Sequence, residues 1–218
     1  MKEVVLFSGL GANDRVFQFL NLGPVRTLIV RWEQPHPGET LEAYAMRMCQ
    51  QIPFTQPVLV GVSFGGMVAV EVSKHLSHER VILISSAPTY RQIPRYFRWA
   101  GALRLHRAIP PRRAKKPGRA LHWIMGVHHD EHKKLMSSIL ADTDPVFLKR
   151  AVDMILRWRN EQVPATLFCV HGAHDRLLPK TDFPYDTVLR GGHLLVVTQA
   201  EAVSACLQKI LAMPPSSR

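Results

Sequence analysis

Several common features are scarce in this 218-residue chain, and each scarcity argues against a class of protein. Its three cysteines, Cys49, Cys169 and Cys206, are odd in number and lie in apolar segments, which argues against a disulfide framework and predicts reduced thiols in the cytoplasm. No apolar run approaches the ~20 residues of a membrane-spanning helix. The first apolar run, Val4 to Phe7, is too short for the core of a signal peptide.

Acidic residues are also scarce. The chain has 28 Lys and Arg against 17 Asp and Glu, a formal net charge of +11. The imbalance is greatest between Arg91 and Arg119, where ten Lys or Arg occur without one Asp or Glu. With 46% hydrophobic and 21% charged residues, however, the composition is that of a globular domain and not of a disordered chain.

The most informative stretch runs from Val58 to Val70. Mostly apolar residues lead to Gly61-Val-Ser63-Phe-Gly65, and an apolar run with helical periodicity follows. This pattern predicts a buried strand, a sharp turn and a helix packed close to the sheet, because Gly61 and Gly65 carry no Cβ. Ser63 is then exposed at the tip of the turn, beside the free N–H groups of a helix N-terminus.

Elsewhere in the two flanking parts of the chain, strands and helices alternate. We predict apolar strands at 3–7, 25–31, 80–86, 164–170 and 185–189. We predict helices at 40–51 and at about 201–212, and a shorter one, of about two turns, after Asn13 or Asp14. Strands that are apolar on both faces are typical of a parallel sheet covered by helices. The expected fold is therefore α/β, with about six mostly parallel strands and helices on both faces.

The stretch 89–162 breaks this pattern. It is rich in Arg, Trp and His, and prolines interrupt its helical segments. We interpret it as a helical cap inserted into a core made of residues 1–88 and 163–218, all within one domain.

Three polar residues each follow a predicted strand. Ser63 comes first, Asp175 follows a later strand, and His193 follows the last one. Loops at the carboxyl ends of parallel strands meet at one edge of the sheet. There a histidine can accept the proton of a serine hydroxyl, while a carboxylate on its other ring nitrogen fixes the tautomer.

These residues give the chain a resemblance to the α/β-hydrolase superfamily. The resemblance rests on Gly61-Val-Ser63-Phe-Gly65, on His171-Gly-x-x-Asp175-x-x-x-Pro179 and on Gly192-His193. It implies that Ser63 is the nucleophile, Asp175 the acid and His193 the base. It also implies an oxyanion hole made by the backbone N–H groups of Leu10 and Phe64.

The chain departs from the family pattern in places. Many members carry His-Gly where this chain has Ser8-Gly9, and the usual antiparallel leading strands are not expected here. The cap matches no particular subfamily.

By this resemblance the chain is a serine hydrolase that cleaves an ester, thioester or similar acyl bond through an acyl-enzyme on Ser63, without metal or organic cofactor. The same fold hosts C–C hydrolase, cofactor-free peroxidase and lyase chemistry. A non-catalytic binding protein that uses the pocket or the basic cap is a further alternative.

Other assignments of the polar residues remain open. Asp182 and Asp186 are rivals of Asp175 for the acid, and His171 is interpreted as a structural residue of its loop. His128 and His132 have the i, i+4 spacing of a zinc site, and His171, His174 and Asp175 form another polar group. No second ligand motif accompanies either, so no metal site is predicted.

The basic stretch has three interpretations. Arginines there alternate with Trp99, Leu103 and Leu105. The stretch is either a solvated exterior, a surface that attracts an anionic acyl substrate or an acidic membrane surface, or a nucleic-acid site. We expect a small-molecule acyl substrate and no nucleic acid.

Overall fold

A computed structural model describes residues 1–97 and 118–214 of the chain. In this part six parallel strands form one sheet, in the spatial order β2-β1-β3-β4-β5-β6. Their bounds are β1 Glu3–Phe7, β2 Arg26–Ile29, β3 Val58–Val62, β4 Arg80–Ile84, β5 Leu167–Gly172 and β6 Thr187–Leu189. The register places Val4 opposite Thr27 of β2 and opposite Val58 of β3. The predicted α/β fold, with a six-stranded parallel sheet, is confirmed.

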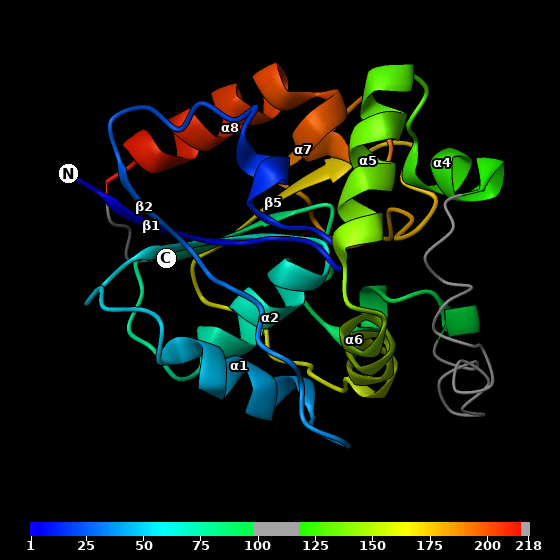
Figure 1. Ribbon diagram of the computed structural model, residues 1–218. Helices are drawn as coiled ribbons and strands as arrows, with labels where there is room; N and C mark the ends of the chain where they lie inside the picture. Colours follow the sequence, from blue (N-terminus) through cyan, green and yellow to red (C-terminus); the bar gives the residue numbers. More distant parts are fainter. Residues whose placement is uncertain (98–117, 215–218) are drawn as a thin grey trace.

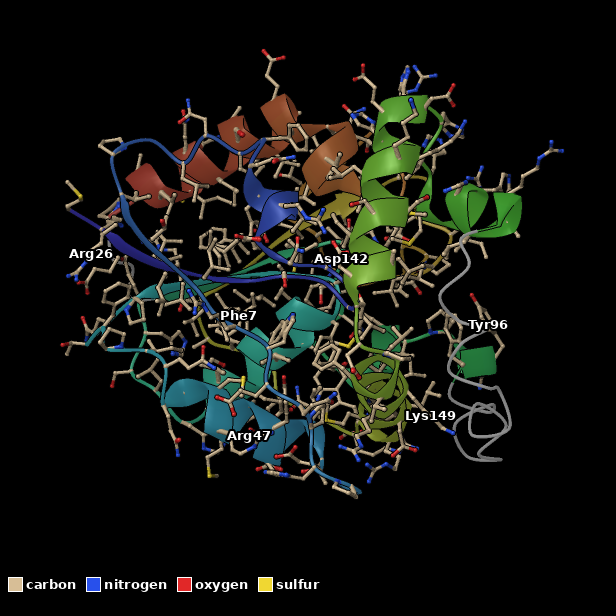
Figure 2. All side chains as sticks on the ribbon, in the orientation of Figure 1. Phe7, Arg26, Arg47, Tyr96, Asp142 and Lys149 are labelled. Atoms are coloured by element: carbon tan, nitrogen blue, oxygen red, sulfur yellow. The ribbon has the colours of Figure 1, made fainter. Side chains whose placement is uncertain are left out.

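Helices cover both faces of this sheet. The covering helices are α1 Leu41–Cys49, α2 Phe64–Val72, α7 Leu195–Thr198 and α8 Ala200–Ala212. Successive side chains of a strand point to opposite faces, so Val5 and Phe7 pack in the layer of α1 and α2, and Val4 and Leu6 pack in the layer of α7 and α8. Figure 1 shows α1 and α2 below the sheet and α8 above it. In Figure 2, Phe7 lies inside the molecule and Arg26 at its periphery.

Three further helices lie beyond the carboxyl ends of the strands (Figure 1). They are α4 Arg119–Met125, α5 Asp130–Asp142 and α6 Pro145–Arg157. The start of α6 is set by its sequence: Asp144 accepts hydrogen bonds from the backbone N–H groups of Val146 (2.7 Å) and Phe147 (2.8 Å), and Pro145 occupies the first turn, where no N–H is needed.

The described part of the predicted cap contains the short 3-10 helix η2 Tyr90–Gln92 together with α4, α5 and α6. Most of the basic stretch, including Trp99, Leu103 and Leu105, lies outside the described residues. The division of the chain into core and cap therefore stays a prediction. Within residues 1–97 and 118–214, no helix has both the length and the hydropathy needed to cross a membrane.

Some elements are shorter than the sequence pattern predicts. They are the two edge strands, β2 with four residues and β6 with three, and each pairs with one neighbour in the sheet. The two-turn helix expected after Asn13 is wrong: the chain forms one 3-10 turn there, η1 Asp14–Phe17, capped by the Asn13 side chain. The chain then turns away at Asn21, whose side-chain oxygen accepts the N–H of Gly23.

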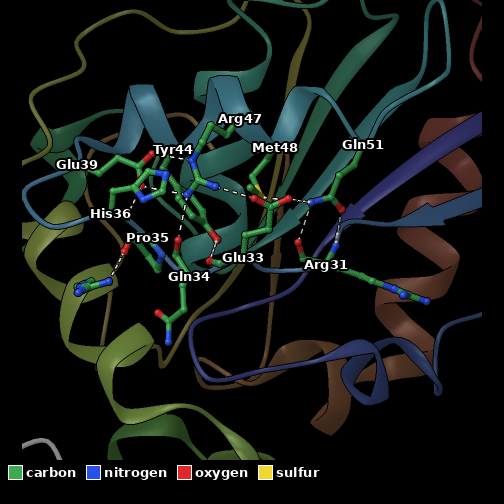
Figure 3. Close-up of polar contacts among 11 residues, drawn as sticks. Arg31, Glu33, Gln34, Pro35, His36, Glu39, Tyr44, Arg47, Met48 and Gln51 are labelled. Atoms are coloured by element: carbon green, nitrogen blue, oxygen red, sulfur yellow. Dashed lines mark hydrogen bonds and ion pairs between the residues drawn. The ribbon is translucent and has the colours of Figure 1, made fainter.

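A polar network fixes the loop between β2 and α1 (Figure 3). The Arg47 guanidinium of α1 donates to the carboxylates of Glu39 (2.8 Å) and Glu33 (2.6 Å) and to the Gln34 carbonyl (3.1 Å). Burial acts to raise the pKa of Glu39, but the hydrogen bonds from Arg47 and from the His36 N–H outweigh it and lower that pKa. The network therefore holds Glu39 in its ionised form.

Candidate active site

The turn between β3 and α2 holds Ser63 in a conformation that L-residues rarely adopt. Its φ is 52° and its ψ is −120°. A Cβ on Gly65 would lie 2.3 Å from the Phe7 carbonyl oxygen, and a Cβ on Gly61 would lie 2.4 Å from the Gly66 Cα. Only glycine fits these positions, so the predicted strand–turn–helix is present and its glycines allow the close approach that the sequence suggested.

Hydrogen bonds hold this strained turn in place. The Ser63 N–H donates to the Ile84 carbonyl of β4 (3.0 Å), and the Ser86 hydroxyl donates to the Ser63 carbonyl (2.6 Å). Strained backbone persists where its surroundings over-determine it. The sequence analysis did not identify Ser86, since nothing in the sequence marks a hydroxyl that bonds a carbonyl 23 residues away.

Ser63, His193 and Asp175 form one chain of hydrogen bonds. The Ser63 Oγ lies 2.8 Å from the His193 Nε2, and the Asp175 Oδ2 lies 2.8 Å from the His193 Nδ1. His193 and Asp175 are buried, and Ser63 opens onto a cavity. The three loops that follow β3, β5 and β6 thus converge at one edge of the sheet.

Asp175 is held by its own loop. Its Oδ1 accepts the backbone N–H groups of Leu177 (2.9 Å) and Leu178 (2.8 Å), which leaves Oδ2 for His193. His171 lies nearby, with its Nε2 3.7 Å from Oδ2, but this nitrogen donates to the Leu178 carbonyl at 2.8 Å. Burial lowers the pKa of His171, so its ring is neutral and anchors the loop.

The rival carboxylates lie elsewhere. Asp186 accepts the Cys169 backbone N–H at 2.8 Å and thereby joins the β6 side of the sheet to β5. Asp182 is exposed in the loop before β6. Neither is bonded to His193.

The two expected backbone donors belong to Phe64, which follows Ser63 in the chain, and to Leu10, whose loop lies next to Ser63. Phe64 is the first residue of α2, where the N–H has no partner within the helix. Leu10 lies in the loop after β1, and a Cβ on the neighbouring Gly9 would lie 3.6 Å from the Ser63 Cβ. The Ser8 hydroxyl braces this loop by donating to the Ala12 carbonyl (3.0 Å). Both Leu10 and Phe64 line the same cavity as Ser63.

That cavity has a volume of about 310 Å³ and an almost wholly apolar lining. Ser63 and His193 supply its polar side chains, and none of the described lining residues is charged. We call its apolar side the helical wall, which consists of lining residues from α4, α5 and α6: Leu121, Met125, Leu135, Met136, Ile139, Leu140, Leu148, Val152, Ile155 and Leu156. The sequence analysis did not identify this wall. The available signal was the helical spacing of Leu135 with Ile139 and of Leu148 with Val152.

The described residues contain no group of three or more His, Cys, Asp or Glu side chains arranged to hold a metal ion. Of the histidines considered for zinc, His132 has its ring 5.8 Å from that of His129, and His171 is bonded to the Leu178 carbonyl.

Comparison with known proteins agrees with this fold. Residues 4–205 match the model of a family described as the alpha/beta hydrolase family. The search of curated protein sequences gave no match.

Solved structures share the architecture at low sequence identity. An esterase from Exiguobacterium antarcticum superposes with a TM-score of 0.76 at 17% identity, over 98% of this chain and 92% of that one. A thermophilic esterase from Thermogutta terrifontis gives 0.71 at 18% identity, over 97% and 89% of the two chains. An enol-lactonase from Burkholderia xenovorans gives 0.68 at 13% identity, over 97% and 90%. At such identities the likeness is one of fold.

Proposed function

This chain belongs to the alpha/beta hydrolase family and is a hydrolase, and on that premise we propose that it cleaves an ester or thioester of an apolar acyl group through an acyl-enzyme on Ser63. One observation carries the proposal: the hydrogen-bonded chain Ser63–His193–Asp175 opens onto an apolar cavity. A serine hydroxyl beside a carboxylate-oriented imidazole is the arrangement that acyl transfer requires.

In the proposed mechanism, Asp175 Oδ2 accepts the Nδ1–H of His193, so Nε2 carries the lone pair that faces the Ser63 Oγ. As Oγ attacks the acyl carbon, Nε2 takes its proton. The imidazolium then gives this proton to the departing alcohol or thiol, and the acyl–oxygen ester on Ser63 remains. Water, deprotonated by His193, attacks that ester and releases the acid and free Ser63.

The oxyanion formed in each step needs donors, and we assign them to the backbone N–H groups of Leu10 and Phe64. Both residues border the cavity beside Ser63, and the Phe64 N–H opens α2. In well-studied hydrolases, loss of one such donor raises the barrier by roughly 3–4 kcal/mol. Because both donors are backbone N–H groups, a side-chain substitution removes neither of them, and the assignment rests on the position of Ser63.

The helical wall supports an apolar acyl group as the part of the substrate that enters the cavity. A charged group of the acyl part buried against the helical wall would meet only apolar side chains there, at a cost of several kcal/mol. We therefore propose that α4, α5 and α6 act as the cap that selects the acyl group.

We also propose a cytoplasmic location. Its support is the state of the three cysteines, which are all free thiols. Burial raises the pKa of the Cys169 and Cys49 thiols, so neither is an activated thiolate that would compete with Ser63 as nucleophile.

Covalent labelling tests the proposal. A fluorophosphonate probe should form one adduct, mapped to Ser63, that is lost in Ser63→Ala and retained in Ser77→Ala, a matched change at an exposed serine. A panel of esters of increasing acyl length should then show an optimum set by the cavity. An adduct at another residue, or none on folded protein, would contradict the mechanism.

A further inference from the structure

A second cavity, of about 410 Å³, is lined by chain neighbours of Asp175 and His193: His174, Arg176 and Gly192. Five of its lining side chains are basic, and we call it the basic groove: His128, His129, His174, Arg176 and Arg190. They come from three separate segments: the α4–α5 connection, the loop after β5 and the loop after β6. No carboxylate is among the described residues that line the groove.

The two arginines belong to the arginines of the described chain that have no carboxylate partner. Six of the eleven others are bonded to carboxylates: Arg15, Arg26, Arg47, Arg80, Arg91 and Arg157. Within residues 1–97 and 118–214, neither Arg176 nor Arg190 has such a partner. Asp130, the acid next to His129 in the chain, pairs instead with Lys133 at 2.8 Å.

Arg176 is also held in position. Its guanidinium lies over the Trp123 ring, 4.2 Å from the ring centre, and its Nη1 donates to the Trp123 carbonyl at 2.9 Å. These two contacts order the guanidinium in advance, while its other N–H groups bond to no other described residue and can bind a ligand. A planar guanidinium of this kind matches the spaced oxygens of a phosphate group.

We propose that the basic groove is a binding site for a phosphoryl group. Two arginines supply positive charge, the arginines and the three histidines supply N–H donors, and a phosphate monoester supplies up to two negative charges and three acceptor oxygens. An uncharged or cationic ligand would leave these groups unpaired.

The groove and the Ser63 cavity share a thin wall. Chain neighbours line the two sides: Gly126 faces the groove and Met125 the cavity, and likewise Gly192 and His193. A Cβ on Gly192 would lie 2.6 Å from the Gly126 Cα, so two backbone segments in contact form this wall. The phosphoryl group therefore comes either from a separate small molecule or from the head group of an acyl substrate. Only the second source rests on the proposed function.

Calorimetric titration of the full chain with inorganic phosphate tests the site without any catalytic readout. The double variant Arg176→Gln/Arg190→Gln should weaken phosphate binding about tenfold or more, the usual effect of losing hydrogen bonds to a charged group. Arg31→Gln is the matched control, because Arg31 is exposed beyond β2, at the opposite edge of the sheet from β6. It should leave binding within about twofold of wild type, since it lies far from the groove.

Arg176 contacts Trp123, whereas the exposed Arg190 side chain makes no hydrogen bond or ion pair with the described residues, so Arg190→Gln alone is a variant that breaks neither. It should weaken binding several-fold while its thermal unfolding matches wild type. Absence of phosphate binding to wild type, or equal binding to wild type and the double variant, would overturn the proposal.

The source of the group is then tested with two esters that differ only in a terminal phosphate on the alcohol part. If the phosphoryl group belongs to the substrate, the phosphorylated ester has the lower KM, and the double variant abolishes that preference. If it belongs to a separate ligand, both esters have the same KM although phosphate still binds in the groove. Phosphate binding is measured equally well on Ser63→Ala, so failure of the hydrolase mechanism and failure of this site are distinguishable.

Discussion

The two sides of the Ser63 cavity are built differently. On the sheet side, Ser63 and His193 are fixed by hydrogen bonds of 2.6–3.0 Å to one another or to neighbouring strands and loops, and by glycines that leave no space for a methyl group. On the other side, the helical wall offers apolar side chains without a charge or a fixed hydrogen bond. A displacement of Ser63 or His193 by about 1 Å lowers the rate of the reaction. The helical wall, by contrast, tolerates substitutions that conserve side-chain volume.

The largest expected effect falls on the sheet side. Loss of the base in His193→Ala, or of the tautomer-fixing carboxylate in Asp175→Asn, should lower kcat for an ester substrate by about 10⁴-fold or more while the protein stays folded. The measurement is steady-state hydrolysis, with circular dichroism as the check on folding.

Asp182→Asn is the matched control, because Asp182 is exposed and is not bonded to His193. Its kcat should stay near that of wild type. If Asp182→Asn were as damaging as Asp175→Asn, the assignment of the acid would be wrong.

The next effect concerns the tight packing of the turn. In Gly65→Ala the new Cβ would lie 2.3 Å from two carbonyl oxygens, those of Phe7 and Ser8, and backbone atoms cannot move aside as a side-chain end can. We expect the free energy of unfolding to fall by about 1–3 kcal/mol or more, as at other overpacked sites. Urea denaturation measures it.

A glycine with open space around it provides the comparison. A Cβ on Gly118 meets no atom of the described residues within 4 Å, and its φ of −87° suits alanine. Gly118→Ala should therefore lower the free energy of unfolding by no more than about 0.5–1 kcal/mol, the difference between glycine and alanine at the N-cap of a helix. Equal denaturation midpoints for both variants would show that the turn is not closely packed.

Changes in the helical wall should alter selectivity and leave the chemistry intact. Leu148→Phe adds volume to the cavity lining, so kcat/KM for the longest accepted acyl ester should fall about tenfold while that for a short ester changes little. Val146→Phe makes a similar enlargement on the same helix at a solvent-exposed position. If both variants lowered activity on short and long esters alike, the wall would not be the selecting surface.

The same contrast explains what the sequence predicts well. Strand-end loops of a parallel sheet meet at one edge by topology, so Ser63, Asp175 and His193 could be placed together although Ser63 and His193 are 130 residues apart. Gly61 and Gly65 can also be interpreted from the sequence alone, because the absence of a Cβ acts on the local backbone and its close neighbours.

The helical wall and the basic groove carry no comparable signal. A stripe such as Leu148 and Val152 shows that a face is apolar but not what it faces, and it was equally consistent with core packing. Arg176, Arg190 and His128 belong to separate loops whose meeting depends on how the chain packs. The concentration of Lys and Arg in the sequence is greatest at 91–119 instead, a stretch that lies mostly outside the described residues.

The smallest expected effect lies away from both sides of the cavity, in the Arg47 network. The pKa of Glu39 is lowered in the folded protein, so its ionised form stabilises the fold above the ordinary carboxyl value of 4.5, and this contribution is lost as the pH falls through the lowered pKa. Glu39→Gln should therefore reduce the free energy of unfolding by about 0.5–1 kcal/mol at pH 7, since solvent screens the partly exposed Arg47, and by less at pH 3–4. The comparison is urea denaturation at both pH values, with Glu42→Gln, an exposed neighbour in α1, as the control.

Ester hydrolysis by Glu39→Gln at pH 7 should equal that of wild type, because the network contributes no residue to the cavity lining. A stability difference that grew toward acid pH would mean that the Glu39 carboxyl is neutral in the folded protein and that the Arg47 contacts do not hold its charge.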